Sequence, residues 1–238
     1  MSQKASVEER LDSLEAENKG LRHEMERLQA VQEIHNLMGR YEFLHTAGRN
    51  DETLELFAMN TPGVRAARGA WGIFDGPEGI KRLYSTVHNY IRTGASNPGK
   101  ENGAGVLIMQ HLTTPVIEVA GDGQTAKGIW VSPGVWTGKQ GEKMQAMWTL
   151  CKYSIDFVKE DGKWKIWHKH VHGIIMTPYE KSWVDDAYDP FVNPLPDELS
   201  PDRPNPGARE YSKELPMELN PVPPEPYETW DESKACVK

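Results

Sequence analysis

The feature that most restricts the fold is a run of long strand-like segments joined by short glycine turns. Three segments are rich in β-branched and aromatic residues: 125–136, 144–158 and 164–176. The turns Gly138–Gly141 and Asp161-Gly162 stand between them, which is typical of antiparallel hairpins. Helical patterns over 34–45 and 77–92 precede most of the strands. We therefore predict an α+β fold in which helices cover one face of a curved antiparallel sheet.

Composition divides the chain into three zones. Residues 1–32 are charged and lack proline, 33–177 hold most strand-forming residues, and 178–238 hold 12 of the 17 prolines. We predict an oligomerisation helix, a catalytic domain and an extended proline-rich arm within these bounds. Aromatic residues such as Tyr211 and Trp230 favour packing of the arm on the domain or on a neighbouring subunit over a disordered tail.

The first zone has the pattern of a coiled coil. Its apolar seam has alternating spacings of four and three: Val7, Leu11, Leu14, Asn18, Leu21, Met25 and Leu28. That spacing keeps one face of a helix against a partner helix, and an amide such as Asn18 in the seam fixes register. We expect a homodimer or a homotrimer, and the spacing does not choose between them. The alternative is a single amphipathic helix that lies on its own domain.

Charge and cysteine content exclude several classes of protein. With 27 Lys and Arg against 35 Asp and Glu, the net charge is −8, which argues against binding nucleic acid. No apolar run of 18 residues predicts a membrane span, and the first residues lack the apolar core of a signal peptide. Cys151 and Cys236 lie too far apart for a disulfide scaffold. We expect a soluble cytoplasmic protein that binds neither nucleic acid nor membrane.

Alternation along the last strand predicts which side chains face inward. One parity holds three lysines: Lys163, Lys165 and Lys169. The other parity holds Trp164, Ile166, His168, His170 and His172. Since lysines prefer water, we expect the histidine face to be covered and Lys169 to point outward. Tyr153 of the preceding strand and His111 of an earlier one would join this wall, with Tyr41 and His45 on a helix opposite.

Several segments resemble the SnoaL-like domains of the nuclear-transport-factor-2-like (NTF2-like) superfamily. They are IHNLMGRY at 34–41, FDGPEGI at 74–80, QHLTTPVIEVAGDGQTAKG at 110–128 and DGKWKIWHKHV at 161–171. The resemblance covers about residues 30–177. It implies a cone in which a curved sheet wraps a long helix around a deep cavity, and it includes scytalone dehydratase-like and bile-acid dehydratase-like enzymes. Such enzymes use positioned acids and bases and no cofactor, so we expect neither cofactor nor metal.

The resemblance also implies roles for individual residues. In scytalone-dehydratase-like members the histidine after the glutamine is catalytic, and His111 matches it. Tyr41 matches the tyrosine of the "RY" motif, which often reaches the cavity. Many members place an aspartate four residues later, where this chain has His45, so an imidazole replaces a carboxylate as the candidate base.

These observations give a set of candidate site residues. The candidate catalytic residues are His111, Tyr41, His45 and His170. The candidate substrate-binding residues are Tyr153, His168, Trp130, Arg68, His88 and Phe157. Histidines titrate near neutral pH and supply both a base and an acid, a tyrosine donates to an oxyanion, and the aromatic rings offer flat apolar surface.

The predicted function is that of a cofactor-independent lyase on a hydroxylated aromatic or polycyclic small molecule. It would remove water, or release formaldehyde from a lignin-derived diarylpropane by retro-aldol cleavage. Three alternatives remain open. The same groups suit an isomerase or cyclase, the cavity suits a non-catalytic binding module, and His168, His170 and His172 could bind a metal.

Overall fold

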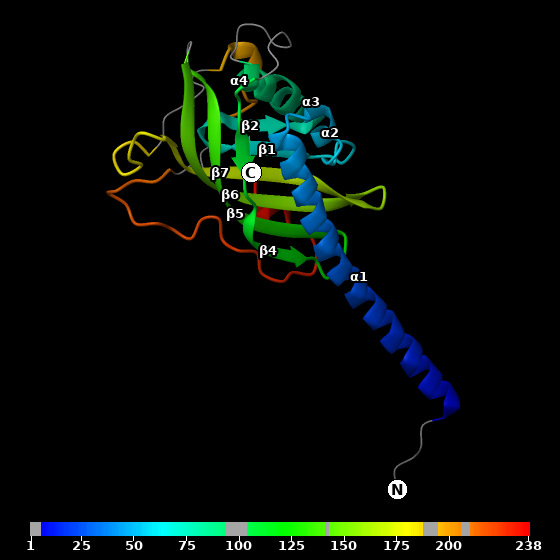
Figure 1. Cartoon of the computed structure of the whole chain (residues 1–238). Coiled ribbons are helices and arrows are strands. Elements are labelled where there is room, and N and C mark those ends of the chain that lie inside the picture. Colours follow the sequence, from blue (N-terminus) through cyan, green and yellow to red (C-terminus); the bar gives the residue numbers. More distant parts are fainter. Residues whose placement is uncertain (1–5, 94–103, 141–142, 188–194, 206–209) are drawn as a thin grey trace.

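The computed structural model describes residues 6–93, 104–140, 143–187, 195–205 and 210–238 of the 238-residue chain. Helices cover one face of a single curved sheet (Figure 1). The α-helices are α1 (Val7–Thr46), α2 (Asn50–Leu54), α3 (Gly76–Lys81) and α4 (His88–Thr93). The strands are β1 (Arg65–Arg68), β2 (Gly72–Asp75), β3 (Ile108–Gln110), β4 (Thr113–Val119), β5 (Thr125–Gln140), β6 (Lys143–Glu160) and β7 (Lys163–Pro178). The predicted α+β class and the long strands are confirmed.

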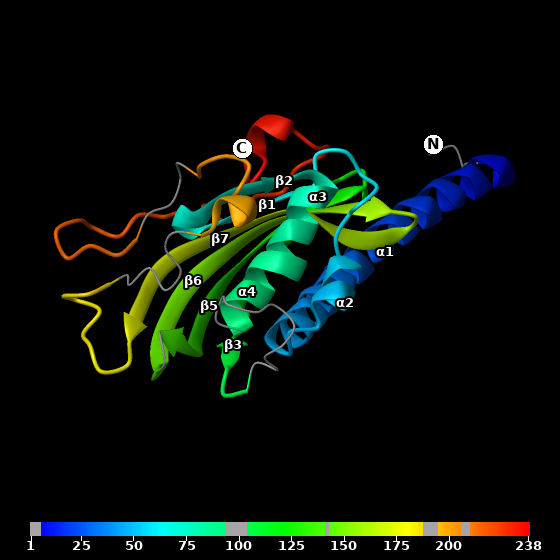
Figure 2. The same ribbon diagram turned by 90° about the horizontal axis from the view of Figure 1, so that it is seen from above.

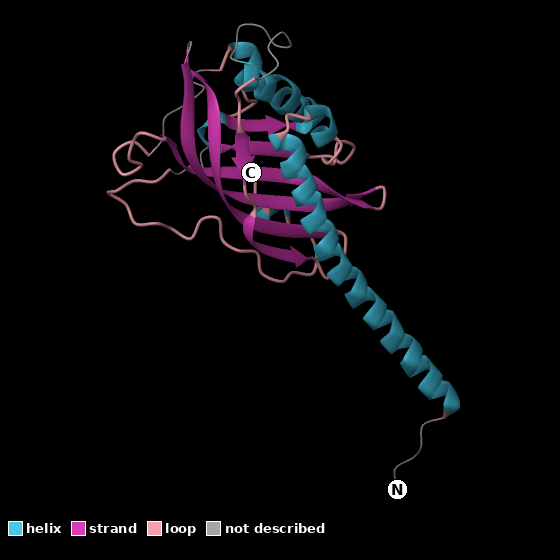
Figure 3. Cartoon of the chain, viewed as in Figure 1, coloured by secondary structure: helices cyan, strands magenta, loops and turns pink. Residues whose placement is uncertain are grey.

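The sheet is mixed, so the prediction of an antiparallel sheet is wrong in one place. Its strand order is β2-β1-β7-β6-β5-β3, and β4 also pairs with β5 (Figure 3). Strands β5, β6 and β7 form the expected antiparallel hairpins, but β1 runs parallel to β7. A short turn imposes antiparallel pairing only on strands that it joins, and β2 to β6 lie between β1 and β7 in the chain.

Helix α1 has two environments along its length. It begins at a capping box, in which Ser6 accepts from the Glu9 amide and Glu9 accepts from the Ser6 amide. Its second half packs on the sheet, with Ile34 and Met38 fully buried. Its first half projects away from the sheet and is exposed (Figure 1), so the alternative that this half lies on its own domain is wrong. Among the described helices, none combines the length and hydropathy needed to cross a membrane.

A β-bulge in β7 reverses the alternation on which the inward-facing residues were predicted. Phe157 pairs with Ile166 but Asp156 pairs with His168, so Trp167 is an extra residue between them. Before the bulge, Ile166 faces the helices. After the bulge, Lys169 takes that face, and His168 turns to the other one.

The face of the sheet opposite the helices carries the end of the chain. Figure 2 shows the helices on one side of the sheet and the C-terminal segment on the other. There His168 donates to Asp156 (Nδ1 to Oδ2, 2.9 Å), and the Cys236 amide donates to the same oxygen (2.8 Å). Arg65, at the edge of this face, donates to the Val237 carbonyl oxygen. These contacts satisfy polar groups that are buried between the sheet and the C-terminal segment.

Candidate active site

A cavity lies between α1, α4 and the inner face of the sheet. The volume open to the centres of water molecules in it is about 80 Å³. Its apolar wall includes Ile91, Ile108, Val171 and Ile175. Its polar groups come from both helices and from four strands. A mostly apolar hollow with a few converging polar groups is the usual form of a small-molecule site.

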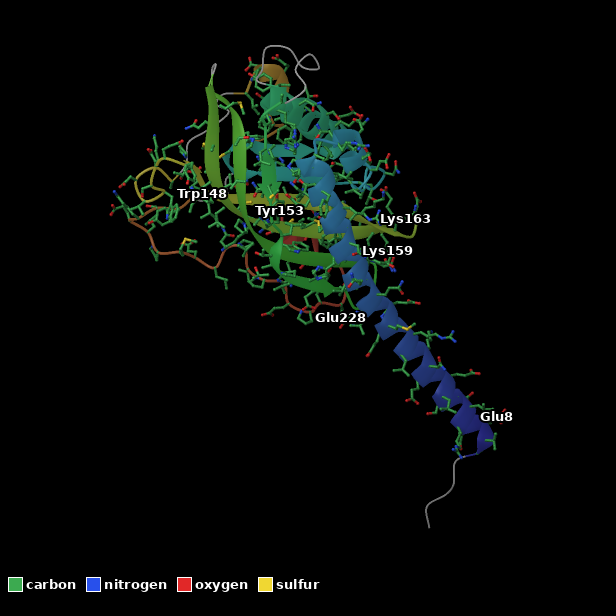
Figure 4. All side chains as sticks on the ribbon, viewed as in Figure 1. Glu8, Trp148, Tyr153, Lys159, Lys163 and Glu228 are labelled. Carbon is green, nitrogen blue, oxygen red and sulfur yellow. The ribbon has the colours of Figure 1, made fainter. Side chains whose placement is uncertain are left out.

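Five of the candidate residues line this cavity: Tyr41, His45, Arg68, His88 and Tyr153. Tyr41 and His45 lie one turn apart on α1, which places both rings on the face that packs on the sheet. Arg68 ends β1 and His88 begins α4. Tyr153 lies in β6 nearer the middle of the sheet than Trp148 of the same strand (Figure 4).

The helical side of the cavity is a cluster of phenols and imidazoles. The hydroxyls of Tyr41 and Tyr84 are hydrogen-bonded at 2.9 Å. The His45 ring stacks on Tyr41 with centroids 5.4 Å apart, and its centroid lies 4.8 Å from that of His88. Tyr84 was not among the candidates, although it stands four residues before His88 and a shared helix face is the signal for it.

A π-helical segment, Arg82–Val87, joins α3 to α4 and carries Tyr84. Such segments are rare, and they occur frequently at functional sites. Here the segment and the start of α4 place Tyr84 against both Tyr41 and His88. The chain therefore brings four rings together from two helices that are distant in sequence.

Burial sets the protonation of these groups. It lowers the pKa of His45 well below the ordinary value, and the positive charges of Lys169, Arg68 and Arg92 lower it further. Burial likewise lowers the pKa of His88. Burial raises the pKa of Tyr41. At neutral pH the cavity therefore presents neutral imidazoles, which can accept protons, beside phenols that keep theirs.

Lys169 is the residue that alternation placed on the wrong face. Only 3% of it is exposed, and its ammonium nitrogen lies 5.3, 5.8 and 5.4 Å from the ring centroids of Tyr41, Tyr84 and Tyr153. Burial lowers the pKa of Lys169 to about 7, and the positive charge of Arg68 contributes to this decrease.

Glu42 supplies the acidic group beside this lysine. Its carboxyl oxygens are buried and accept no hydrogen bond from the described residues. Burial raises the pKa of Glu42 to about 7, and the Lys169 charge opposes that rise. No sequence pattern pointed to Glu42, because it lies between the predicted cavity positions Tyr41 and His45 on a largely polar helix.

His111 does not reach the cavity, so the prediction of its position is wrong. Gln110 lines the cavity instead and donates to Thr149 (Nε2 to Oγ1, 2.8 Å). His111 follows directly, so alternation turns it outward, where it is exposed beside the Pro133 carbonyl oxygen. The family motif located the strand correctly but did not fix which of two adjacent side chains faces inward.

Four other candidates also lie outside the cavity lining. The bulge at Trp167 turns His168 and His170 to the opposite face, where the His170 ring donates to Cys236 and accepts from Asn205. Trp130 and Phe157 are buried in the core, with ring centroids 6.2 Å apart, rather than at the cavity wall.

Each of the three histidines that suggested a metal site has a hydrogen-bond partner on the outer face of the sheet. The His170 ring nitrogens have the partners given above, and His172 accepts from the Ser154 hydroxyl at 3.0 Å. Within the described ranges, no three His, Cys, Asp or Glu side chains gather closely enough to hold a metal ion.

Comparison with known proteins finds one family. The family described as "SnoaL-like domain" matches residues 26–170, which is more than half of the chain. No curated protein matches the chain.

Solved structures share the fold at low sequence identity. A protein named "Putative Scytalone Dehydratase" from Novosphingobium aromaticivorans is 15% identical, with a TM-score of 0.50 over 66% of this chain and 92% of its own. The hexachlorocyclohexane dehydrochlorinase LinA-type3 from Novosphingobium barchaimii is 16% identical, with a TM-score of 0.51 over 67% and 96%. A "putative dehydratase from the NTF2-like family" of Streptomyces avermitilis is 14% identical, with a TM-score of 0.50 over 62% and 98%. At such identities the likeness shows the fold alone.

Proposed function

The chain belongs to the family of SnoaL-like domains, and on that premise we propose that it is a cofactor-independent lyase. It would act by acid–base catalysis on a hydroxylated aromatic or polycyclic small molecule. Two of the similar structures are named as dehydratases and one as a dehydrochlorinase, and both names describe elimination of a small group from neighbouring carbons. The cavity holds groups suited to that chemistry.

The observation that carries the proposal is the contact of His45 with Tyr41. The Nδ1 atom of His45 is buried and has no hydrogen-bond partner among the described residues. Its ring stacks on Tyr41, whose hydroxyl is bonded to that of Tyr84. A neutral imidazole therefore lies beside a protonated pair of phenols, so the cavity holds one group that can accept a proton and a pair that can donate one.

In a dehydration, His45 accepts the proton from the carbon next to the one that bears the hydroxyl group. The C–O bond breaks, the leaving oxygen takes a proton from Tyr41, and a carbon–carbon double bond forms. The products are an alkene and water. The proton on His45 then returns to Tyr41, and Tyr84 stabilises the transient phenolate through its hydrogen bond.

The finer proposal is a retro-aldol reaction of a lignin-derived diarylpropane. Here the base removes the proton of a hydroxymethyl group, the adjoining C–C bond breaks, formaldehyde leaves, and the phenol pair protonates the carbon that keeps the electron pair. The same residues serve both reactions. The two differ in the group lost, so product mass distinguishes them.

The first experiment is a mass-resolved screen of hydroxylated aromatic compounds with the purified full chain and no added cofactor. A product lighter by water or by formaldehyde supports a lyase. A product of unchanged mass indicates an isomerase or cyclase, and tight binding without conversion indicates a binding module. Either of these last two results contradicts the proposal.

The second experiment replaces the proposed acid, Tyr41, and the proposed base, His45. We expect Tyr41→Phe and His45→Gln each to lower kcat at least about 100-fold, because one positioned proton-transfer group contributes about 10² to 10⁴ in rate. His111→Gln is the matched control, since that ring is exposed and outside the cavity, and it should keep wild-type turnover. Unchanged kcat in both cavity variants would remove His45 and Tyr41 from the reaction.

A further inference from the structure

Three cationic side chains line the cavity: Arg68, Arg92 and Lys169. None of them forms an ion pair with a carboxylate of the described residues. Arg92 is used by the fold, because its guanidinium donates to the carbonyl oxygens of His45 and Thr46 at the end of α1. The other two cations remain for a ligand.

Arg68 and Lys169 make contacts that hold them in place without neutralising them. Arg68 donates to Nε2 of His88 at 3.0 Å, and its guanidinium carbon lies 4.2 Å from the centroid of Trp71. Lys169 faces three tyrosine rings. Contacts with aromatic rings stabilise a cation but leave its charge in place.

Among the described residues, Glu42 is the one carboxylate that acts on Lys169, and it does not balance the two cations. Glu42 interacts with Lys169, but no ion pair joins them. When Lys169 is protonated, one carboxylate, even fully ionised, leaves one of the two positive charges uncompensated. A buried cation without a counter-ion is costly, and an anion that enters the cavity offsets that cost.

We propose that the substrate carries an anionic oxygen, as a carboxylate or a phenolate, which is held between Arg68 and Lys169. The proposal rests on the lyase function above and specifies the substrate class. Lys169 contacts the rings of Tyr41 and Tyr84, so an anion at Lys169 lies next to the phenol pair. The reacting carbons then lie within reach of His45, which stacks on Tyr41.

Binding of three small probes to the full chain tests the proposal without turnover. Benzoate and benzamide have the same shape and differ in charge, and 4-nitrophenol shows by its visible absorbance whether it is bound as the phenolate. We expect benzoate to bind at least 10-fold more tightly than benzamide by calorimetry, or 4-nitrophenol to bind as the phenolate. A preference for benzoate indicates a carboxylate substrate, and a bound phenolate indicates a phenol.

Two variants assign the preference to the named residues. Lys169→Met and Arg68→Gln should each weaken anion binding at least 10-fold. Arg65→Gln is the control, since Arg65 lies on the same strand but donates to Val237 and Glu232 outside the cavity. Wild-type protein that binds benzoate no better than benzamide and holds 4-nitrophenol as the neutral phenol overturns the proposal, and this result needs no variant to fold.

Because no catalysis is measured, failure of this proposal and failure of the lyase proposal are distinguishable. If the wild-type protein shows no preference for anions but converts a compound, only the proposed substrate class is rejected. If the wild-type protein prefers anions but converts no compound, only the proposed lyase function is rejected.

A second inference concerns the exposed half of α1 and rests on different observations. Six apolar seam residues are between 54% and 77% exposed: Val7, Leu11, Leu14, Leu21, Met25 and Leu28. Nothing in the described chain covers them. A continuous apolar stripe of this kind on a projecting helix marks an interaction surface.

The seam faces away from its own domain. His23 donates to the Gly121 carbonyl oxygen at 2.6 Å, and Arg27 donates to that of Val119 at 2.9 Å. Ala30 is buried. These residues follow Leu21, Met25 and Leu28 by two positions each, which is about 200° around the helix. A partner helix on the seam therefore meets no part of the domain that the same helix carries.

Charges beside the seam fit a second copy of this chain in parallel orientation. In a parallel pair, Arg10 faces Glu15 of the second copy, and Glu17 faces Arg22 of the second copy. Asn18 meets Asn18 of the second copy, where the two amides satisfy each other. We infer that α1 forms a parallel two-stranded coiled coil between two copies of the chain.

Molar mass by light scattering and cross-linking test this inference on the full chain. We expect a dimer, a disulfide between copies in Asn18→Cys, and monomers in Leu14→Lys. Ser13→Lys is the control, because Ser13 lies beside the seam residue on the polar face. A monomeric wild type, a trimer, or no cross-link at residue 18 overturns the inference.

Discussion

Among single residues, Lys169 has strongly altered chemistry. Its position in β7 buries an ammonium group beside Arg68, and burial lowers the pKa of Lys169 to about 7. The three tyrosine rings around it favour the charged form, but they do not replace the water that burial removes. The amine is therefore close to half protonated at neutral pH, and a small change in its surroundings switches its charge.

This altered pKa predicts a pH dependence of stability. Between pH 7 and the ordinary pKa of 10.5, the unfolded chain binds a proton at Lys169 that the folded protein does not. The free energy of unfolding should therefore rise with pH across that window, by about 1.4 kcal/mol per unit at most from this group. Urea unfolding at pH 7 and pH 9.5 measures the rise.

Lys169→Met should lose that contribution, so its stability should gain less between the two pH values than that of the wild type. Lys163→Met, at an exposed position of the same strand, should keep the wild-type pH dependence. Parallel pH profiles for Lys169→Met and wild type would show that Lys169 titrates normally.

The sequence predicted the cavity residues of helix α1 correctly and those of strand β7 incorrectly, because the two kinds of spacing respond differently to an extra residue. Helical spacing placed Tyr41 and His45 on one face, and the structure has both at the cavity. A prediction from strand alternation fails more easily, because one extra residue in the strand exchanges the side chains of the two faces. The exchange put Lys169 inside in place of His170, and nothing in the alternation of the strand marked the extra residue.

At the scale of elements, two irregularities position the site. The bulge at Trp167 turns Lys169 inward, and the π-helical segment Arg82–Val87 brings Tyr84 to Tyr41. Neither irregularity has a marked sequence pattern, since both regions read as a regular strand and a regular helix. The regular parts, such as the long strands and the Asp161-Gly162 turn, were predictable because spacing and glycine conformation determine them.

The space around two glycines, one in β5 and one in α1, predicts opposite effects of replacing them by alanine. A Cβ atom at Gly128 would lie 2.5 Å from the Trp130 ring, so Gly128→Ala should destabilise the fold by about 1–3 kcal/mol. At Gly39 of α1 a Cβ atom would meet nothing within 4 Å, and Gly39→Ala should stabilise it by about 0.5–1 kcal/mol. Chemical denaturation of the two variants should give shifts of opposite sign, and shifts of one sign would contradict the packing described for β5.

At the scale of the whole molecule, the family motifs were the strongest guide. Together they predicted a curved sheet around a long helix, and the matched residues 26–170 contain that helix's second half and most of the sheet. They gave no information on the parallel pairing of β1 with β7, which depends on contacts between distant parts of the chain. The segment that covers the outer face also lies beyond the match, so no motif indicated that His170 would donate to the Cys236 carbonyl oxygen.

One unbroken helix carries both the exposed seam and two cavity residues, Tyr41 and His45. Each residue of an α-helix turns it by about 100° and lengthens it by 1.5 Å. Adding or removing one residue between Leu28 and Ile34 would therefore swing the seam a quarter-turn or more around the domain. Over evolutionary time the exposed side chains of this stretch should change freely, while its length stays fixed.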